Sequence, residues 1–362
     1  MKILQTILSG LLVPFAWLYG LATSVRNRLF DSGLLPIESF NIPMISVGNL
    51  SAGGTGKTPH IEYLVRLLSR NYRIAVLSRG YRRKSKGFVL ADDKATAQTL
   101  GDEPMQIYRK FPNIIVAVDA DRRAGIRRLL ADYQPEIILL DDAFQHRYVR
   151  AGLSILLTDW RRPFWRDRLL PVGRLREAGS GYRRADMIIV SKTPDDFHID
   201  DKDFLPANLN IHPLFSRFQY RSLQPVFPQQ IRKESLERLK KDRYSLLLVA
   251  GIAHPENLIR HLQNYTTQLS VLRFADHHDF TQKDVEKIEQ TFNNITTNHK
   301  IIITTEKDAV RLMKNAYLSD EIRQALFYLP IEVVFVCPEQ EELFKSTIED
   351  YVKKIRRNRI LA

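Results

Sequence analysis

SVGNLSAGGTGKTP, residues Ser46–Pro59, is the stretch of this chain that decides its fold. The apolar run Asn41–Val47 predicts a strand that leads into it, and Ile61–Leu68 begins a helix directly after it. Strand, glycine-rich loop, Lys-Thr pair and helix, in this order, are the context of a phosphate-binding P-loop. In such a loop the backbone N–H groups turn toward phosphate oxygens at the N-terminus of the helix.

The residues predicted to bind nucleotide phosphates are Ser51, Ala52, Gly53, Gly54, Thr55, Gly56, Lys57 and Thr58. We expect Lys57 to reach the β- and γ-phosphates and the Thr58 hydroxyl to ligate Mg²⁺. The usual pattern has a glycine where Ser51 stands, and the glycines that follow supply flexibility nearby. A glycine-rich turn that opens a helix without binding nucleotide is the alternative.

A P-loop protein is expected to place an acidic side chain at the end of a later hydrophobic strand. Here Asp141 and Asp142 follow the apolar run Ile137–Leu140. The carboxyl edge of a parallel sheet is where a carboxylate that holds Mg²⁺ belongs, so both residues are candidate metal ligands together with Thr58. Adjacent strand residues point to opposite faces, so one carboxylate can bind the metal while the other orients it. A pair that caps a turn is the alternative.

Further apolar runs alternate with helical stretches, which predicts an α/β fold with a doubly wound, mostly parallel sheet of the P-loop NTPase type. These runs are 74–78, 114–118, 154–158 and 187–191. A second, smaller α/β pattern contains runs at 244–251, 300–305 and 333–337. The predicted organisation is an N-terminal helix at 1–32, a P-loop domain at 33–205, a linker at 206–230 and a C-terminal α/β lobe at 231–362.

Composition excludes several classes of protein. The chain has 362 residues, of which 44% are hydrophobic and 26% are charged, and this excludes a disordered, collagen-like or polytopic membrane protein. Its one cysteine, Cys337, cannot form an intrachain disulfide, which fits a reducing compartment. The net charge of +13 indicates an anionic partner. Because no RNA-binding signature is present, we do not expect that partner to be nucleic acid.

The N-terminal segment Ile3–Val25 carries no charged side chain, and basic residues bracket it. Pro14 and several polar residues weaken the case for a full membrane span. Apolar residues recur at helical spacing, with Trp17 and Tyr19 as aromatic anchors, which favours a helix that lies on a membrane surface. A spanning helix, a buried core helix and a signal peptide are the alternatives.

These motifs together resemble one family, tetraacyldisaccharide 4'-kinase, which is the lipid A 4'-kinase of Gram-negative bacteria. The resemblance runs from the N-terminal helix to about Arg311, with Ala143 where the family usually has glycine. The blocks that carry it, besides Ser46–Pro59, are SRGYRRKSKG (Ser78–Gly87), GDEP (Gly101–Pro104), DDAFQHR (Asp141–Arg147), LLPVGRLRE (Leu169–Glu177), GIAHPE (Gly251–Glu256), ADHHDF (Ala275–Phe280) and TTEKDAVR (Thr304–Arg311).

The resemblance implies a function. That family transfers the γ-phosphate of ATP to the 4'-hydroxyl of a tetraacyldisaccharide 1-phosphate, forming lipid IVA at the cytoplasmic face of the inner membrane. It implies ATP and Mg²⁺ as cofactors, and an acylated disaccharide 1-phosphate lipid and the inner-membrane surface as partners. No obligate protein partner is implied. The implied fold is a P-loop domain joined by a β-ribbon linker to a smaller α/β lobe, with the N-terminal helix on the bilayer.

By the same resemblance, Asp102 and His277 form the dyad that acts as the catalytic base. A sugar hydroxyl is a poor nucleophile at neutral pH, and an imidazole oriented by a carboxylate can accept its proton. We expect Asp102 and His277 to lie in different lobes and the site to be completed when the lobes close. An N-capping role is the alternative for Asp102, and His278 stands beside His277 as an alternative base.

Substrate contacts are assigned with less support from the sequence. Arg176 and Glu177 are candidates for binding substrate or bridging the lobes, with a surface ion pair as the alternative. Gln145 and His146 are expected to continue the site. Arg82 belongs to a basic cluster that an anionic lipid headgroup would explain.

Two other functions remain open from the residues alone. One is a P-loop GTPase or metallochaperone that uses hydrolysis to switch partners. A GTPase of the usual kind shows an Asn-Lys-x-Asp motif, whereas the corresponding strand here ends in Ser191–Pro194, Ser-Lys-Thr-Pro. The other is a membrane-tethered nucleotide-binding scaffold, in which Asp102 and His277 are dispensable while Lys57 still matters.

Overall fold

The computed structural model describes residues 2–197, 204–206, 209–227, 229 and 234–361, with side chains described from residue 11 to residue 358. The predicted linker 206–230 therefore falls partly outside the described residues. The chain divides into two compact units. Unit 1 comprises Met1–Lys94, Ile107–Phe218 and Val333–Ala362, and unit 2 comprises Ala95–Gln106 and Gln219–Glu332.

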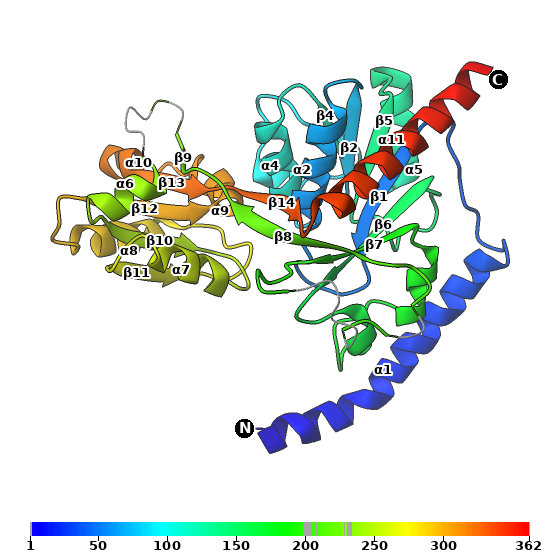
Figure 1. Ribbon diagram of the computed structural model, residues 1–362, viewed down its shortest axis with the longest axis horizontal. Coiled ribbons are helices and arrows are strands. Elements are labelled where there is room, and N and C mark those ends of the chain that lie inside the picture. The colour runs from blue at the N-terminus through cyan, green and yellow to red at the C-terminus, as the bar shows by residue number, and fades with distance from the viewer. Residues whose placement is uncertain (1, 198–203, 207–208, 228, 230–233, 362) are drawn as a thin grey trace. The chain divides into compact units, whose positions relative to one another are not determined.

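Unit 1 is built on a nine-stranded sheet with the order β14-β8-β7-β6-β1-β5-β2-β4-β3 (Figure 1). The strands are β1 (Met44–Asn49), β2 (Ile74–Ser78), β3 (Val89–Leu90), β4 (Ile115–Val118), β5 (Ile137–Asp141), β6 (Leu153–Asp159), β7 (Met187–Ser191), β8 (Leu214–Tyr220) and β14 (Ile331–Phe335). From β8 to β4 each pair of neighbours is parallel, and β3 is antiparallel to β4. The predicted α/β class with a mostly parallel, doubly wound sheet is confirmed.

The position of β1 in this sheet explains where a ligand site belongs. Strand β1 lies between β5 and β6, and every residue of β1 is buried. The connection after β1 leads to β2 on one side of it, while β6 and β7 lie on the other side. The topological switch point is therefore at the carboxyl end of β1, where open α/β sheets bind their ligands. The glycine-rich loop begins at this end.

Helices cover the sheet of unit 1. In α2 (Lys57–Leu68) the residues Ile61, Leu64, Val65 and Leu68 are buried, at the spacing of one helix face. The remaining helices of the unit are α1 (Lys2–Asp31), the C-terminal end of α4 (Asp102–Lys110) from Ile107 onward, α5 (Arg122–Arg128), the π-helical turn η1 (Leu129–Tyr133), the 3₁₀ turns η2 (Phe164–Arg166) and η3 (Gly179–Arg184), and α11 (Pro338–Leu361).

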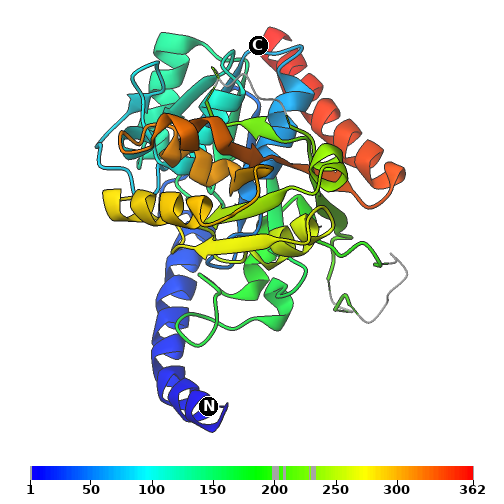
Figure 2. The same ribbon diagram turned by 90° about the vertical axis from the view of Figure 1, so that its left-hand side faces the viewer.

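Helix α1 packs on unit 1 through its C-terminal half. Phe30 is buried, and the hydroxyl of Tyr19 donates a hydrogen bond to the backbone carbonyl of Arg176 at 2.7 Å. Figures 1 and 2 show the N-terminal part of this helix projecting away from the sheet. From residue 11 onward, where its side chains are described, the exposed large apolar ones are Leu11, Val13, Phe15, Trp17, Leu18, Leu21 and Val25. Within residues 2–361, as far as they are described, no helix combines the length and apolarity needed to cross a membrane.

Unit 2 is built on a five-stranded sheet with the order β11-β10-β12-β13-β9. Its strands are β9 (Gln224–Pro225), β10 (Ser245–Ala250), β11 (Leu269–Arg273), β12 (Lys300–Thr305) and β13 (Leu326–Leu329). All neighbours are parallel except β9 and β13. Its helices are α3 (Ala97–Leu100), α6 (Leu236–Lys241), α7 (Glu256–Gln263), α8 (Gln282–Asn293), α9 (Glu306–Leu312) and α10 (Asp320–Ala325).

Two apolar cores cover the two faces of the unit 2 sheet, and β10 shows how the sequence builds them. Leu247 and Val249 belong to one core, whereas Leu246 and Leu248 belong to the other. Successive side chains of a strand point to opposite faces, so a continuous apolar run is what a strand buried on both faces requires.

The chain enters and leaves unit 2 more than once. Strands β8 and β14 are neighbours in the nine-stranded sheet and both cross the unit boundary. The run 333–337, expected in the second α/β lobe, is therefore largely part of the first sheet. Residues 95–106 pack with unit 2, so the expectation that Asp102 and His277 lie in different lobes is wrong. A contiguous division of the sequence misses this segment because it is short and far in sequence from the rest of its unit.

Candidate functional site

The loop between β1 and α2 requires glycine for two separate physical reasons. Gly53 has φ 118° and Gly56 has φ 85°, both in the region that favours glycine. A Cβ atom on Gly56 would also lie 2.5 Å from Cζ of Phe218, so a side chain does not fit there. The backbone of the loop therefore depends on these glycines, as the sequence predicted.

Buried polar side chains hold this loop in its conformation. Asn49 at the end of β1 donates to the Thr55 hydroxyl at 2.9 Å, and the Ser191 hydroxyl donates to the Thr55 carbonyl at 2.7 Å. The ammonium of Lys192 donates to the carbonyl of Gly54. Residues at the ends of β1 and β7 thus hold the loop, through long-range contacts that no local sequence pattern indicates.

His60 stabilises the first turn of α2 rather than acting in chemistry. Its Nδ1 lies 2.8 Å from the Gly56 carbonyl and its Nε2 lies 3.1 Å from the Ser216 hydroxyl. Burial lowers the pKa of His60 to about 4, so the ring is neutral at pH 7.

Two cations face the carboxylate of Asp142 just after β5. Lys57 Nζ lies 3.6 Å from Asp142 Oδ1, and an Arg176 Nη atom lies 3.2 Å from the same oxygen. Burial by itself raises the pKa of Asp142, but Lys57 and Arg176 outweigh burial and hold the pKa below its ordinary value. Asp142 has φ 48°, the left-handed region that few residues other than glycine adopt.

Asp141 ends β5 and is held by its own set of contacts. Its Oδ2 accepts a hydrogen bond from the Ser78 hydroxyl at 3.2 Å, and its backbone carbonyl accepts one from Arg122 at 3.4 Å. The Arg122 side chain is 2% exposed, and burial lowers its pKa to about 10, so it remains a cation at pH 7. Arg122 is another functional candidate that the sequence did not single out.

The other predicted substrate residues fall partly in the same network. Gln145 donates to the Asn49 carbonyl at 2.6 Å and to Glu177 at 3.4 Å, and Glu177 also pairs with Arg184 at 2.7 Å. Helix α1 joins this network, because Asn27 donates to Glu177 at 2.6 Å. The predicted residues at this end of the sheet therefore share contacts with the N-terminal helix.

Two further substrate candidates, His146 and Arg82, differ in exposure. Burial lowers the pKa of His146 to about 4, with Arg122 as the next contribution, so this ring is neutral at pH 7. Arg82 is exposed, with its guanidinium 5.6 Å from the ring centroid of Tyr81 and φ 59°.

The oxygens assigned to Mg²⁺ in the sequence fit such an ion chemically. Thr58 lies in the first turn of α2, Asp141 ends the strand next to β1, and Asp142 directly follows that strand. Hydroxyl and carboxylate oxygens are the ligands that Mg²⁺ prefers. The donor set at the carboxyl end of β1 and β5 is therefore suited to Mg²⁺.

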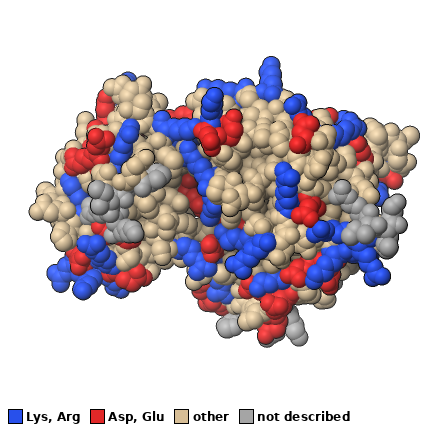
Figure 3. All heavy atoms as spheres, turned by 90° about the horizontal axis from the view of Figure 1, so that it is seen from above, with Lys and Arg blue, Asp and Glu red and all other residues tan. Residues whose placement is uncertain are grey.

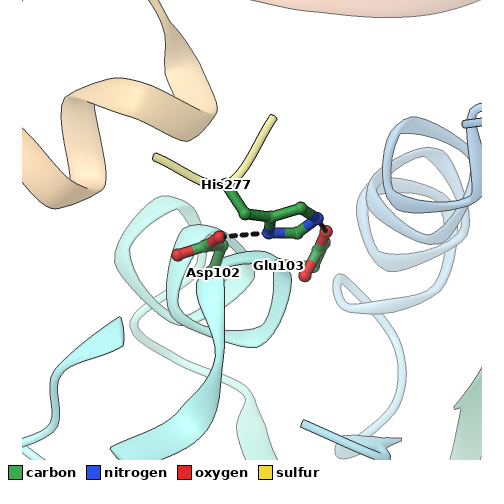
Figure 4. Close-up of side chains that lie close together, drawn as sticks. All are labelled: Asp102, Glu103 and His277. Atoms are coloured by element: carbon green, nitrogen blue, oxygen red, sulfur yellow. Dashed lines mark hydrogen bonds and ion pairs between the residues drawn. The ribbon is translucent and has the colours of Figure 1, made fainter. Parts of the chain in front are cut away.

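A second cluster lies wholly in unit 2 and contains Asp102 and His277 (Figure 4). His277 Nδ1 lies 2.6 Å from Asp102 Oδ2. Asp102 is 1% exposed, and burial by itself raises its pKa. Hydrogen bonds from His277 and Arg311 outweigh burial and hold the pKa of Asp102 below its ordinary value. The structure thus brings together the two residues proposed as the dyad, both within unit 2, whereas the glycine-rich loop belongs to unit 1.

Helix α9 supplies two cations to this pair, and the sequence reading missed both. Arg311 donates from Nε to Asp102 Oδ1 at 2.7 Å and from an Nη atom to Oδ2 at 2.8 Å. Lys307 Nζ lies 2.9 Å from His277 Nε2. Lys307 and Arg311 are four residues apart on one helix face, and this spacing within the block Thr304–Arg311 was the available signal.

The neighbouring histidine has a different environment. His278 Nε2 lies 2.9 Å from Asp284 Oδ2, and its ring stacks on Phe274 with centroids 4.9 Å apart. The hydroxyl and backbone N–H of Thr281 also donate to the same Asp284 oxygen at the start of α8. Of the two adjacent histidines, the structure places only His277 against Asp102.

Asp102, Glu103 and His277 each offer a ligand atom within 4.8 Å of the others, a spacing that would suit a metal ion. The Lys307 ammonium already stands at this cluster, 3.7 Å from Glu103 Oε1 and 2.9 Å from His277 Nε2. The Lys307 side chain thus supplies the positive charge that these acidic groups attract. The arrangement of Asp102, Glu103 and His277 therefore fits a dyad better than a metal centre.

Residues 8–353 match the protein family described as Tetraacyldisaccharide-1-P 4'-kinase. The chain belongs to this family. It is 47% identical over 360 residues to the tetraacyldisaccharide 4'-kinase of Bacteroides thetaiotaomicron, covering 96% of this chain and 94% of the relative. It is 49% identical over 351 residues to that of Parabacteroides distasonis, covering 94% of each.

A solved structure of the family has the same fold. It is the "apo" form LpxK from Aquifex aeolicus, crystallised in complex with ATP, and the two structures superpose with a TM-score of 0.74. The sequence identity is 29%, over 95% of this chain and 99% of that one. The family resemblance drawn from the motif blocks is therefore confirmed.

Proposed function

We propose that this chain transfers the γ-phosphate of ATP to the 4'-hydroxyl of a tetraacyldisaccharide 1-phosphate. The observation that carries the proposal is the contact at 2.6 Å between the buried carboxylate of Asp102 and the half-buried ring of His277, in a member of this kinase family. A nucleotide switch or scaffold needs only the glycine-rich loop, whereas transfer to a hydroxyl benefits from a positioned proton acceptor.

In the proposed reaction the hydroxyl proton moves to Nε2 of His277 while the hydroxyl oxygen bonds to the γ-phosphorus. The bond from the γ-phosphorus to the bridging oxygen breaks, and ADP leaves with the electron pair. Asp102 stabilises the imidazolium that forms, and the ring later releases its proton to water. The loop belongs to unit 1 and the dyad to unit 2, so we expect neither unit alone to transfer phosphate.

The residues of unit 1 have the complementary task of binding and neutralising phosphate. The backbone of Ser51–Gly56 and the ammonium of Lys57 would hold the phosphates. Thr58, Asp141 and Asp142 would hold Mg²⁺, which neutralises the charge that develops on the phosphate oxygens. Lys57 already lies 3.6 Å from Asp142, so the loop and the acidic pair are close enough to serve one bound nucleotide.

The lipid is proposed to approach from a membrane surface. Exposed Phe15, Trp17 and Leu21 on α1 suit the interfacial region of a bilayer, and the net charge of +13 suits anionic lipid. Figure 3 shows Lys and Arg side chains spread over the face that it draws, with acidic ones between them. We propose peripheral attachment to the cytoplasmic face of the inner membrane. Arg82, Gln145, His146, Arg176 and Glu177 are the proposed headgroup contacts.

The test is transfer of label from γ-labelled ATP to tetraacyldisaccharide 1-phosphate in mixed micelles with Mg²⁺. We expect labelled lipid from the wild type, and a loss of at least ~10²-fold in Lys57→Ala and Asp102→Ala. Lys354→Ala, an exposed position on α11, is the matched control and should retain activity. Free labelled phosphate without labelled lipid would instead support the switch-type NTPase.

A further inference from the structure

The nitrogen of His277 that would accept the proton already has a hydrogen-bond donor. Nδ1 faces the ionised carboxylate of Asp102 at 2.6 Å, so Nδ1 carries the proton and Nε2 presents its lone pair. The ammonium of Lys307 has donors only and lies 2.9 Å from that Nε2. The contact is therefore a hydrogen bond from Lys307 to the acceptor atom of the dyad.

Lys307 has other acceptors within reach. Its Nζ lies 2.9 Å from Asp276 Oδ1 and 3.7 Å from Glu103 Oε1. The side chain is 19% exposed and has a flexible four-carbon stem. The ammonium can therefore leave Nε2 and keep carboxylate partners, so its departure does not strand a buried charge.

Arg311 does not share this freedom. Its hydrogen bonds go to both oxygens of the buried carboxylate of Asp102, at 2.7 and 2.8 Å. One face of α9 thus carries two cations of different kinds: Arg311 holds the carboxylate, and Lys307 covers the nitrogen that a substrate hydroxyl must reach.

We propose that Lys307 is a displaceable cap on Nε2 of His277. In the free protein the ammonium donates a hydrogen bond to the lone pair of Nε2. When the acceptor hydroxyl arrives, it displaces Lys307 onto Asp276 and Glu103 and donates to Nε2 in its place. Lys307 keeps all its protons throughout, so it is a positioning residue and not the base. The inference rests on the proposed function, since it names what the hydroxyl must displace.

The direct test measures how readily the ring nitrogen reacts. Diethyl pyrocarbonate transfers an ethoxycarbonyl group to an available imidazole nitrogen, releasing ethanol and carbon dioxide. We expect the cap to protect His277, so that Lys307→Met accelerates its acylation several-fold, as followed by tandem mass spectrometry of the peptide. Lys307→Arg, which restores a cationic donor, should react like the wild type. Lys287→Met, at an exposed position on α8, is the matched control and should also match the wild type.

A kinetic test follows in the same variants. Without the cap, the hydroxyl no longer competes with an internal donor, so Lys307→Met should lower the KM for lipid about two- to tenfold, the equivalent of one hydrogen bond. The KM for ATP should be unchanged. Unchanged acylation of His277 in Lys307→Met would overturn the cap, and so would a raised lipid KM, which would make Lys307 a lipid-binding residue. Acylation does not depend on turnover, so failure of the proposed kinase activity would show separately, as wild type that leaves the lipid unlabelled.

Discussion

Arg311→Met tests how far α9 determines the properties of Asp102. The substitution removes two charge-assisted hydrogen bonds, at 2.7 and 2.8 Å, from a carboxylate that is 1% exposed. Breaking a buried ion pair by removing one partner costs about 3–5 kcal/mol, because the remaining charge stays buried. His277 still donates to Asp102, so we expect a loss near 3 kcal/mol, the lower end of that range.

The pH dependence of this loss has a defined sign. The pKa of Asp102 in the folded chain is below its ordinary value, so the stability it contributes is present above the unfolded-state pKa of about 3.9. That contribution disappears as the pH falls through the folded-state pKa. Removing Arg311 leaves the effect of burial in place, so the pKa of Asp102 rises. As the pH is lowered, the free energy of unfolding of the variant should therefore start to change at a higher pH than that of the wild type.

The assay is denaturant unfolding followed by far-UV circular dichroism at several pH values. The three tryptophans, Trp17, Trp160 and Trp165, all belong to unit 1, so tryptophan fluorescence would not report on unit 2. The control is Arg273→Met, because Arg273 is 58% exposed and pairs at 3.3 Å with Glu256, which is 48% exposed. Such a surface pair contributes about 0–1 kcal/mol. If Arg311→Met cost no more than this control, or if its stability followed pH as in the wild type, the reasoning about Asp102 would be refuted.

Three further experiments have expected outcomes: one compares the two histidines, one changes the glycine-rich loop and one tests the metal. His277→Ala should reduce lipid phosphorylation by about 10²–10⁴-fold whereas His278→Ala should reduce it little, as measured by initial rates; equal losses would contradict the assignment of the dyad. Gly56→Ala should weaken ATP binding in calorimetry and lower the free energy of unfolding by about 1–3 kcal/mol. The reasons are the φ of 85° at this position and the clash of the added Cβ with Phe218. Unchanged ATP binding would contradict the loop geometry. Chelation of Mg²⁺ should abolish transfer, and Asp142→Asn should raise the Mg²⁺ concentration needed for half-maximal rate.

The sequence predicted the elements of the sheet well, and the physical reason is local. Runs such as Ile74–Ser78 and Met187–Ser191 are apolar up to a final serine and buried at every residue, as expected of strands buried on both faces, and each is a strand in the structure. The glycine-rich loop was also predictable, because its order of strand, glycines and Lys-Thr is contained in one short stretch.

What the sequence could not give was the packing between distant segments. Residues 95–106 join unit 2 through contacts such as that between Asp102 and Arg311, which are far apart in the chain. The family resemblance paired Asp102 with His277, but periodicity and composition carry no signal for such a pair. Lys307 was not predicted for a related reason. A lysine near the start of a helix is common, and the sequence does not show that a histidine nitrogen lies beside it.

Backbone strain at the two clusters supports the same division of roles. Asp142 has φ 48° and His277 has φ 61°, and neither is a glycine. Residues in this region are strained and persist only where the surrounding structure holds them. Asp142 is held by Lys57 and Arg176, and His277 by Asp102 and Lys307. At each position a cation and a second charged partner contact the side chain that the proposed chemistry uses. On this argument, removing Lys307 should loosen the His277 ring as well as uncover it, whereas removing a surface lysine such as Lys287 should do neither.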